Sequence, residues 1–163
     1  MNVEYEVYRV DSDGDGLSDK WETLNGRDPQ DGRLYFAFDC GAWQTEGWFS
    51  EDISANLAGS LGTLDFELDR ESGSIRREGL NILVSEADKE LSLDIRSSGD
   101  LKGVISLNGQ TVGDIRIDAS HTFQTISLNL NSSRWGDSIQ SLEFTFTGDA
   151  STVVEIDTIQ ILR

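Results

Sequence analysis

The sequence predicts an all-β protein, a jelly-roll β-sandwich preceded by a short loop and helix. From Leu34 onward, about nine short runs such as LYFAF, LDFEL, LSLDI and LEFTFT alternate apolar and polar residues with a period of two. Gly, Asn, Asp or Ser residues separate these runs, and nothing after Asn25 has helical periodicity. Many short strands without helices between them are typical of a sandwich, and a barrel is the less favoured alternative.

The alternation gives each expected strand one apolar face. We expect two of these faces to meet across the sandwich and supply much of the core, with side chains from Leu91, Leu93, Ile95, Leu142, Phe144 and Phe146. In SLNGQT, Asn108 and Gly109 predict a two-residue hairpin turn, because both residues tolerate positive φ.

The last expected strand, VVEIDTIQIL, breaks the alternation. Its apolar residues fall on even positions at Val154 and Ile156 but on odd positions at Ile159 and Ile161. A β-bulge near residues 157–158 explains the change, because one extra residue moves the following side chains to the other face. A central strand buried on both faces explains the pattern equally well.

Turn-forming residues divide the chain into two parts. The stretch LNGRDPQDGR is rich in Gly, Asp and Pro and separates an acidic amino-terminal segment from the expected strands. The chain of 163 residues, 37% of them hydrophobic, is long enough for one main domain with a real core. We therefore expect an amino-terminal segment over 1–32 and a β-sandwich domain over 33–163.

Charge and composition exclude several partners. A net charge of −17 argues against nucleic acids and anionic membranes, which such a chain would repel. Cys40 is the only cysteine, so no internal disulfide is possible. No apolar run is long enough to span a bilayer, and MNVEYEVYRV does not read as a signal sequence. The chain is either cytoplasmic or a piece of a longer secreted protein.

The acidic segment DSDGDGLSDKWE fits the calcium-loop pattern DxDxDGxxxxxE at each specified position. A Ca²⁺ ion takes about six to eight oxygen ligands, and one short loop provides them when alternate residues point inward. Gly16 makes the sharp turn, and Asp19, at loop position nine, acts through a water. The expected ligands are the carboxylates of Asp11, Asp13, Asp15 and Glu22, the carbonyl of Leu17, and Asp19.

A metal-free acidic linker is the alternative for this segment. The residues that follow predict a short helix from about Ser18 to Gly26, which favours the calcium loop. Trp21 and Leu24, three residues apart, are expected to pin the helix against the sandwich. A paired second loop is missing, so Asp28 or Asp31 could complete this site or form part of another.

The stretch DSDGDGLSDKWETLNGRDP resembles the calcium-binding repeats of thrombospondin type 3 kind in secreted bacterial proteins, often written DxDGDGLxDxWExxxGxDP. In those proteins the repeats are calcium-stiffened spacers between domains. The resemblance implies a secreted or cell-surface bacterial protein with structural calcium, and a chain linked to further domains.

The remainder resembles the galactose-binding-like β-sandwiches among carbohydrate-binding modules of bacterial polysaccharide-degrading enzymes. The stretches that carry this resemblance are FAFDCGAWQTEGW, AGSLGTL, FQTISLNLNSSRWGDSIQSLEFTF and VEIDTIQI. Such modules often hold a structural calcium near their termini. The resemblance makes Asp157 a candidate ligand and Asp39 a weaker one, and an exposed acid on a bulge is the alternative.

Sugar binding needs flat aromatic faces and planar polar groups. Trp43, in the CGAWQTEG loop, is the preferred aromatic, whereas Trp48 and Trp135 coincide with positions that look structural in the family pattern. Arg76 and Arg77 could face an acidic sugar, although a solvated turn explains them equally well. The other candidate polar partners are Tyr35, Asn131 and Arg134. We therefore take Trp43, Arg76, Arg77 and Trp135 as the expected ligand-binding residues.

No catalytic pattern is present in the sequence. His121, the only histidine, has no nucleophile beside it that resembles a catalytic elbow. The leading interpretation is a noncatalytic, calcium-stabilised module that binds a polysaccharide or oligosaccharide. A calcium-dependent spacer or protein-interaction domain without a sugar site is the alternative, and a small jelly-roll lyase or hydrolase is a weaker third.

Overall fold

A computed structural model describes residues 10–13, 18–24, 28–30, 35–38, 45–51, 58–60, 62–80, 82–83, 90–130 and 138–162. Strands dominate these residues, and the helix they include is α2, Asp19–Leu24. The strands are β1 Tyr35–Phe36, β2 Trp48–Phe49, β3 Ala58–Ser60, β4 Thr63–Glu67, β5 Ser72–Arg77, β6 Ile82–Leu83, β7 Glu90–Ser97, β8 Leu101–Leu107, β9 Gln110–Ile117, β10 Gln124–Asn129, β11 Ser138–Ile139, β12 Leu142–Thr147 and β13 Val153–Leu162.

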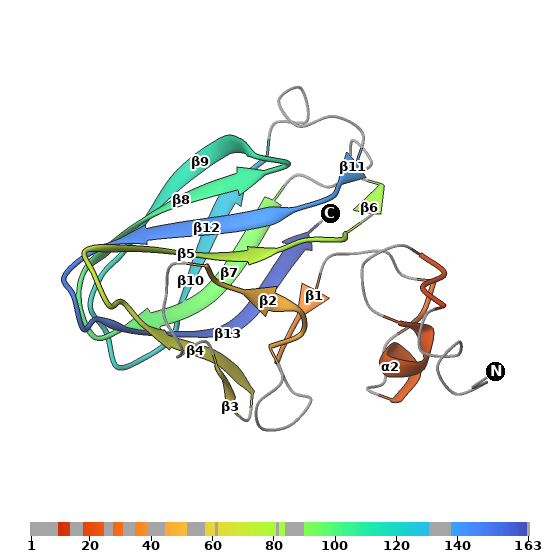
Figure 1. The fold of residues 1–163 in the computed structure, drawn as a ribbon, viewed down its shortest axis with the longest axis horizontal. Helices are drawn as coiled ribbons and strands as arrows, with labels where there is room; N and C mark the ends of the chain where they lie inside the picture. The colour runs from red at the N-terminus through yellow and green to blue at the C-terminus, as the bar shows by residue number, and fades with distance from the viewer. Residues whose placement is uncertain are drawn as a thin grey trace.

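Two antiparallel sheets form the two layers of a β-sandwich (Figure 1). The first, in the order β10-β7-β13-β4-β3 with β1 added beside β13, is the six-stranded sheet. The second, in the order β2-β5-β12-β8-β9, is the five-stranded sheet, and β6 pairs with β11 separately. This architecture confirms the predicted all-β jelly-roll sandwich.

The predicted apolar faces meet in the core. Leu91, Leu93 and Ile95 from β7 are buried against the same cluster as Leu142, Phe144 and Phe146 from β12. Aromatic rings join the layers, because Phe66 of β4 lies 5.6 Å from Phe146, centroid to centroid. The alternation in the sequence therefore predicted the core faces of both sheets correctly.

Two local predictions are also confirmed. Asn108 and Gly109, with φ of 51° and 75°, form the two-residue turn between β8 and β9. The register of β13 against β7 shifts between Ile156 and Thr158, which places the β-bulge at Asp157. Residues on both sides of the shift, including Ile156 and Ile159, are buried in the one core, so the bulge explains the broken alternation.

Four connections meet at one end of the sandwich, at the left of Figure 1, and we call this the loop end: residues 68–71, 98–100, 118–123 and 148–152. Backbone hydrogen bonds join them. Gly148 N donates to Glu71 O at 2.9 Å, and Ser151 N donates to Leu68 O at 2.7 Å. Ser98 N donates to Val153 O at 2.9 Å. The loop end is therefore held in a defined shape by its own backbone.

Candidate functional site

The amino-terminal acidic segment forms a loop that closes onto the start of α2. Asp19 N donates to Val10 O at 2.8 Å. The Asp19 carboxylate accepts from Ser12 at both oxygens, from the backbone N at 2.7 Å and from Oγ at 2.6 Å. Asp19 thus holds the two ends of the predicted calcium loop together, and its role through a water stays a prediction. Asp15 and Leu17 lie outside the described residues.

The other carboxylates of this loop are partly or fully withdrawn from water. Glu22, on α2, is 1% exposed, and Asp11 and Asp13 are half-buried. Burying a carboxylate is costly unless a cation or hydrogen-bond donors compensate for the lost water, so these oxygens suit a hard cation. Within the described residues, no group of three or more His, Cys, Asp and Glu side chains is close enough to hold a metal.

The predicted packing of α2 is half untested and half wrong. The helix spans Asp19–Leu24, within the predicted bounds, but the Leu24 side chain is 71% exposed and does not pin it to the sandwich. Leu24 is the last residue of the helix, and its side chain faces solvent. The placement of the Trp21 side chain lies outside the described structure. Asp28 is exposed, and Asp31 is outside the described residues.

Asp157 occupies the bulge of β13 and is half-buried. β1 pairs with the residues that follow, Tyr35 with Gln160 and Phe36 with Ile159. Asp39, the weaker candidate ligand, lies outside the described structure, so a calcium site here stays a prediction.

Arg77 is a structural clamp. Its side chain is 9% exposed, Nε donates to Glu46 O at 2.9 Å, and Nη1 donates to Glu78 O. The guanidinium also lies 5.8 Å from the centroid of the Phe36 ring. Arg77 therefore fixes the turn before β2, where Glu46 and Gly47 have φ of 49° and 81°. All of these contacts are internal to the fold.

Arg76 points to the other face of β5 and is neutralised there. Its Nη2 lies 2.6 Å from Glu143 Oε2 on β12, and its Nη1 lies 3.1 Å from Glu78 Oε1. The hydrogen bond that Arg76 donates to the Glu143 carboxylate is the main cause of a raised pKa for Arg76. With two carboxylates already beside it, Arg76 is a poor candidate for an acidic ligand.

The tryptophans divide between the core and the part of the chain that is not described. Trp48 is 2% exposed and packs between Phe36 and Phe144, at centroid distances of 5.5 and 5.6 Å. Its structural role, implied by the resemblance, is thus confirmed. Trp43 and Trp135 lie outside the described residues, as do Asn131 and Arg134 and the placement of the Tyr35 side chain.

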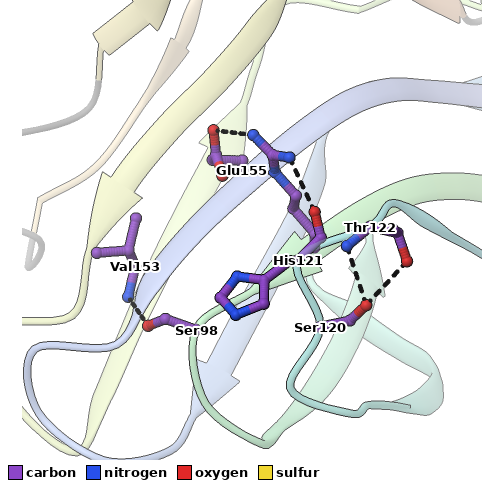
Figure 2. Close-up of polar contacts among 7 residues, drawn as sticks. Ser98, Ser120, His121, Thr122, Val153 and Glu155 are labelled. Atoms are coloured by element: carbon purple, nitrogen blue, oxygen red, sulfur yellow. Dashed lines mark hydrogen bonds and ion pairs between the residues drawn. The ribbon is translucent and has the colours of Figure 1, made fainter.

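The structure adds an aromatic residue that sequence reasoning missed. Phe123, just before β10, is 38% exposed, and the Arg96 guanidinium lies 4.6 Å from the centroid of its ring. Arg96 also donates to Glu155 and to the carbonyl of His121, and Figure 2 labels these two acceptors and draws the dashed contacts that reach them. The signal was present, because Phe123 begins the face that continues with Thr125, Ser127 and Asn129 and is the one apolar residue on it.

Arg96 is held in place by a two-point ion pair on the outer face of the six-stranded sheet. Nε donates to Glu155 Oε2 at 2.6 Å, and Nη2 donates to Glu155 Oε1 at 2.8 Å. The hydrogen bond with Glu155 raises the pKa of Arg96. Nη1 donates to His121 O at 3.0 Å, so His121 contributes its backbone carbonyl to this arrangement.

A second polar group continues this face. Asp94 on β7 accepts hydrogen bonds from Thr125 Oγ1 at 2.5 Å and from Thr158 Oγ1 at 2.9 Å. Asp94 and Arg96 alternate with buried residues of β7, so both point outward. Phe123, Arg96, Glu155, Asp94 and Thr125 together form what we call the Phe123 face: one aromatic ring beside planar, oriented polar groups.

No protein-family model matches the chain, and no curated protein matches it. Solved structures do share its fold. A family 29 carbohydrate-binding module complexed with mannohexaose matches with a TM-score of 0.56 and 12% identity, over 79% of this chain and 91% of the other. A family 28 module specific for non-crystalline cellulose matches with a TM-score of 0.55 and 13% identity, over 78% and 92%.

The N-terminal cellulose-binding domain of β-1,4-glucanase C from Cellulomonas fimi is also similar, with a TM-score of 0.54 and 17% identity over 77% of this chain and 93% of that domain. At these identities the likeness shows the fold: a two-layer β-sandwich of the kind found in carbohydrate-binding modules. Among the described helices, none is long and apolar enough to cross a membrane.

Proposed function

We propose that this chain is a noncatalytic carbohydrate-binding module that binds a polysaccharide or oligosaccharide. The observation that carries the proposal is its two-layer sandwich, which is shared over most of both chains with modules that bind mannohexaose or cellulose. The acidic surface of the chain is compatible with a neutral ligand, because no phosphate or lipid charge has to be approached.

The Phe123 face has the chemistry for the contact. The exposed part of the Phe123 ring offers an apolar surface to the C–H face of a sugar ring. Arg96 and Glu155 are oriented by their two-point ion pair, and Asp94 is oriented by two threonines. Such pre-oriented donors and acceptors can bind sugar hydroxyls with little further loss of side-chain entropy.

Affinity electrophoresis through gels that contain neutral or acidic polysaccharides, with calcium supplied, tests this function. The wild-type chain should be retarded by at least one polysaccharide, and F123A should lose about tenfold in affinity or more, as for truncation of a central aromatic contact. V104A is the matched control, because Val104 is 39% exposed and lies on the other sheet. If F123A and the wild type are retarded equally, the sugar-binding site does not lie on the Phe123 face.

We further propose one structural calcium in the loop over 11–22. The residues that would hold it are Asp11, Asp13, Asp15 and Glu22, with the carbonyl of Leu17. The burial of Glu22 and the closure of the loop by Asp19 support this proposal. A bound Ca²⁺ would neutralise the clustered carboxylates and stiffen the loop. Asp157 is proposed as a ligand of a separate ion near the bulge.

Removal of calcium tests this site. A ligand that binds only the folded state stabilises it by about 2.7 kcal/mol at a concentration of one hundred times its Kd. The melting temperature should therefore fall in chelator, and D13N should reduce the difference between calcium and chelator. D118N is the control, because Asp118 is exposed in the β9–β10 connection. Identical melting curves in calcium and in chelator would contradict the site.

The same calcium loop supports a second candidate function. A calcium-stiffened segment ahead of a compact sandwich suits a spacer or a protein-interaction domain without a sugar site. We propose that the chain, whether it is a carbohydrate-binding module or a spacer domain, belongs to a secreted or cell-surface bacterial protein with further domains. If no polysaccharide retards the chain while chelation still lowers its melting temperature, the spacer function is the better account.

A further inference from the structure

Two cations lie side by side at the loop end of the five-stranded sheet. Lys102 on β8 and Arg116 on β9 are register partners, and both side chains are exposed. They are fourteen positions apart in the sequence, so the sheet rather than the local chain brings them together. Like charges directly opposite one another on neighbouring strands are destabilising.

Neither of these two cations is neutralised by the described part of the chain. Among the described residues, the side chains of Lys102 and Arg116 make no hydrogen bond and no ion pair, whereas Arg76 and Arg96 are paired with glutamates. The chain has 30 acidic and 13 basic residues, so an unpaired cation pair is unexpected. One acidic residue on a neighbouring strand would be enough to neutralise such a cation. Glu143, the register partner of Arg76, does this for Arg76.

A pocket of about 300 Å³ opens beside the pair. Lys102 and Arg116 line it from the sheet, with Thr147 at the end of β12. Glu71, Asp100 and Asp149 line it from the loop end. Its volume lies at the lower end of the range for sites that bind small molecules, and it combines cations with hydrogen-bond acceptors.

The walls of this pocket are pre-formed. Gly148 N donates to Glu71 O at 2.9 Å, and Thr152 Oγ1 donates to Asp149 O at 2.7 Å. The Asp100 carboxylate accepts from Ala119 N at 2.8 Å, which orients it. A Cβ on Gly148 would overlap the Leu101 side chain and lie 3.0 Å from Asp100 O, so the chain approaches itself closely here. Both cations are therefore carried by strands, and the loop segments that complete the pocket are fixed by hydrogen bonds.

We propose that this pocket binds the anionic substituent of an acidic sugar, a uronate carboxylate or a sulfate ester. The anion lies between the Lys102 ammonium and the Arg116 guanidinium, with charge-assisted hydrogen bonds from both. The hydroxyls of the same sugar donate to the carboxylates of Glu71 and Asp149, which accept but cannot donate. An acidic sugar carries both kinds of group, whereas an inorganic anion would leave the carboxylates unmatched. This inference rests on the proposed carbohydrate-binding function and adds to the Phe123 face a second subsite, on the other sheet, for acidic sugars.

The test is amide chemical-shift mapping of the calcium-loaded full chain with soluble oligosaccharides. The probes are hexuronate oligosaccharides built from galacturonate, glucuronate or mannuronate, each beside its methyl ester, and a sulfated galactan oligosaccharide beside its desulfated form. The amides of Lys102, Arg116 and Asp149 should shift with an acidic probe and not with its uncharged partner. If only the uronate probes cause these shifts, the bound group is a carboxylate. If only the sulfated probe causes them, it is a sulfate ester.

Charge-matched variants sharpen the result. R116Q and R76Q make the same substitution on the same face of the same sheet and change the net charge equally. R116Q should lower the affinity for the acidic probe about tenfold or more, because a hydrogen bond to a charged group is lost. R76Q should leave that affinity within about twofold of the wild type, because Arg76 is already paired with Glu143.

Three outcomes would overturn the inference. If acidic and uncharged probes bind equally and R116Q has no effect, the anion subsite is wrong while the carbohydrate-binding function stands. If acidic probes shift amides only around Phe123, the site lies on the other sheet. If no oligosaccharide shifts any amide, both the inference and the proposed function fail.

Discussion

The five-stranded sheet carries two pairs of cations at opposite ends, and the pairs differ in how they are neutralised. Arg76 and Arg77 are neighbours in the sequence but point to opposite faces, and each is paired within the fold. Lys102 and Arg116 are distant in the sequence but adjacent in register, and the described chain pairs neither. The prediction that Arg76 and Arg77 act together on a ligand was therefore wrong, because successive side chains of a strand point to opposite faces of the sheet.

The largest expected effect is at Arg77. R77A should lower the free energy of unfolding by about 3 kcal/mol, because the carbonyls of Glu46 and Glu78 lose their charged donor and the contact with Phe36 is lost. Urea denaturation monitored by tryptophan fluorescence measures this change. A loss no greater than that of R76A would show that Arg77 is not a clamp.

Gly47 gives a smaller effect at the same end of the sheet. A Cβ there would lie 2.7 Å from Arg77 Nε, and the residue has φ of +81°, so G47A should cost about 2 kcal/mol from crowding and backbone strain. Gly79 is the control, because its φ is +72° and no atom lies within 4 Å of its added Cβ. G79A should cost about 1 kcal/mol, from the backbone alone.

Equal losses in G47A and G79A would show that the contact between Gly47 and Arg77 adds nothing. Chemical denaturation of both variants under one set of conditions makes this comparison, since both replace a glycine with positive φ by alanine. The difference between the two variants isolates the steric part of the effect.

The smallest effect compares the exposed members of the two pairs. R76Q should lower the free energy of unfolding by about 0.5 to 1 kcal/mol, because it breaks a surface ion pair that salt and solvent screen. R116Q should change it by less than about 0.5 kcal/mol, because no ion pair is lost. The raised pKa of Arg76 keeps its charge present below the unfolded-state pKa, so its contribution is lost only as the pH rises through the folded pKa.

Chemical denaturation of R76Q and R116Q at low salt measures the difference, and high salt should shrink the loss in R76Q. If R116Q loses more stability than R76Q, then Arg116 has a partner within the folded chain. The anion subsite would then lose its basis.

The two-residue alternation of apolar side chains and the residue types in the turns were sufficient to predict much of the fold. The faces around Leu93 and Phe144, the Asn108–Gly109 turn and the bulge at Asp157 all follow from local patterns that the structure confirms. These features depend on residues close together in the chain, where alternation and positive φ act directly. A short helix that begins near Ser18 was predicted for the same reason, but the solvent-facing position of Leu24 was not.

The candidate site was less predictable because it depends on register between strands. Nothing in the local sequence tells that Arg76 lies opposite Glu143 or that Lys102 lies opposite Arg116, since both pairings join distant segments. Phe123 could have been found, because it begins the polar face of β10. Asp15, Trp43 and Trp135 remain predictions, outside the described residues.

The central claim is that the sandwich binds sugar, and oligosaccharide titration followed by amide chemical shifts tests it most directly. With mannohexaose or cellohexaose and calcium present, the account predicts shifts at Phe123, Thr125 and Glu155 in the wild type that are lost in F123A and kept in V104A. A wild-type spectrum that stays unchanged with every neutral and acidic oligosaccharide would contradict it.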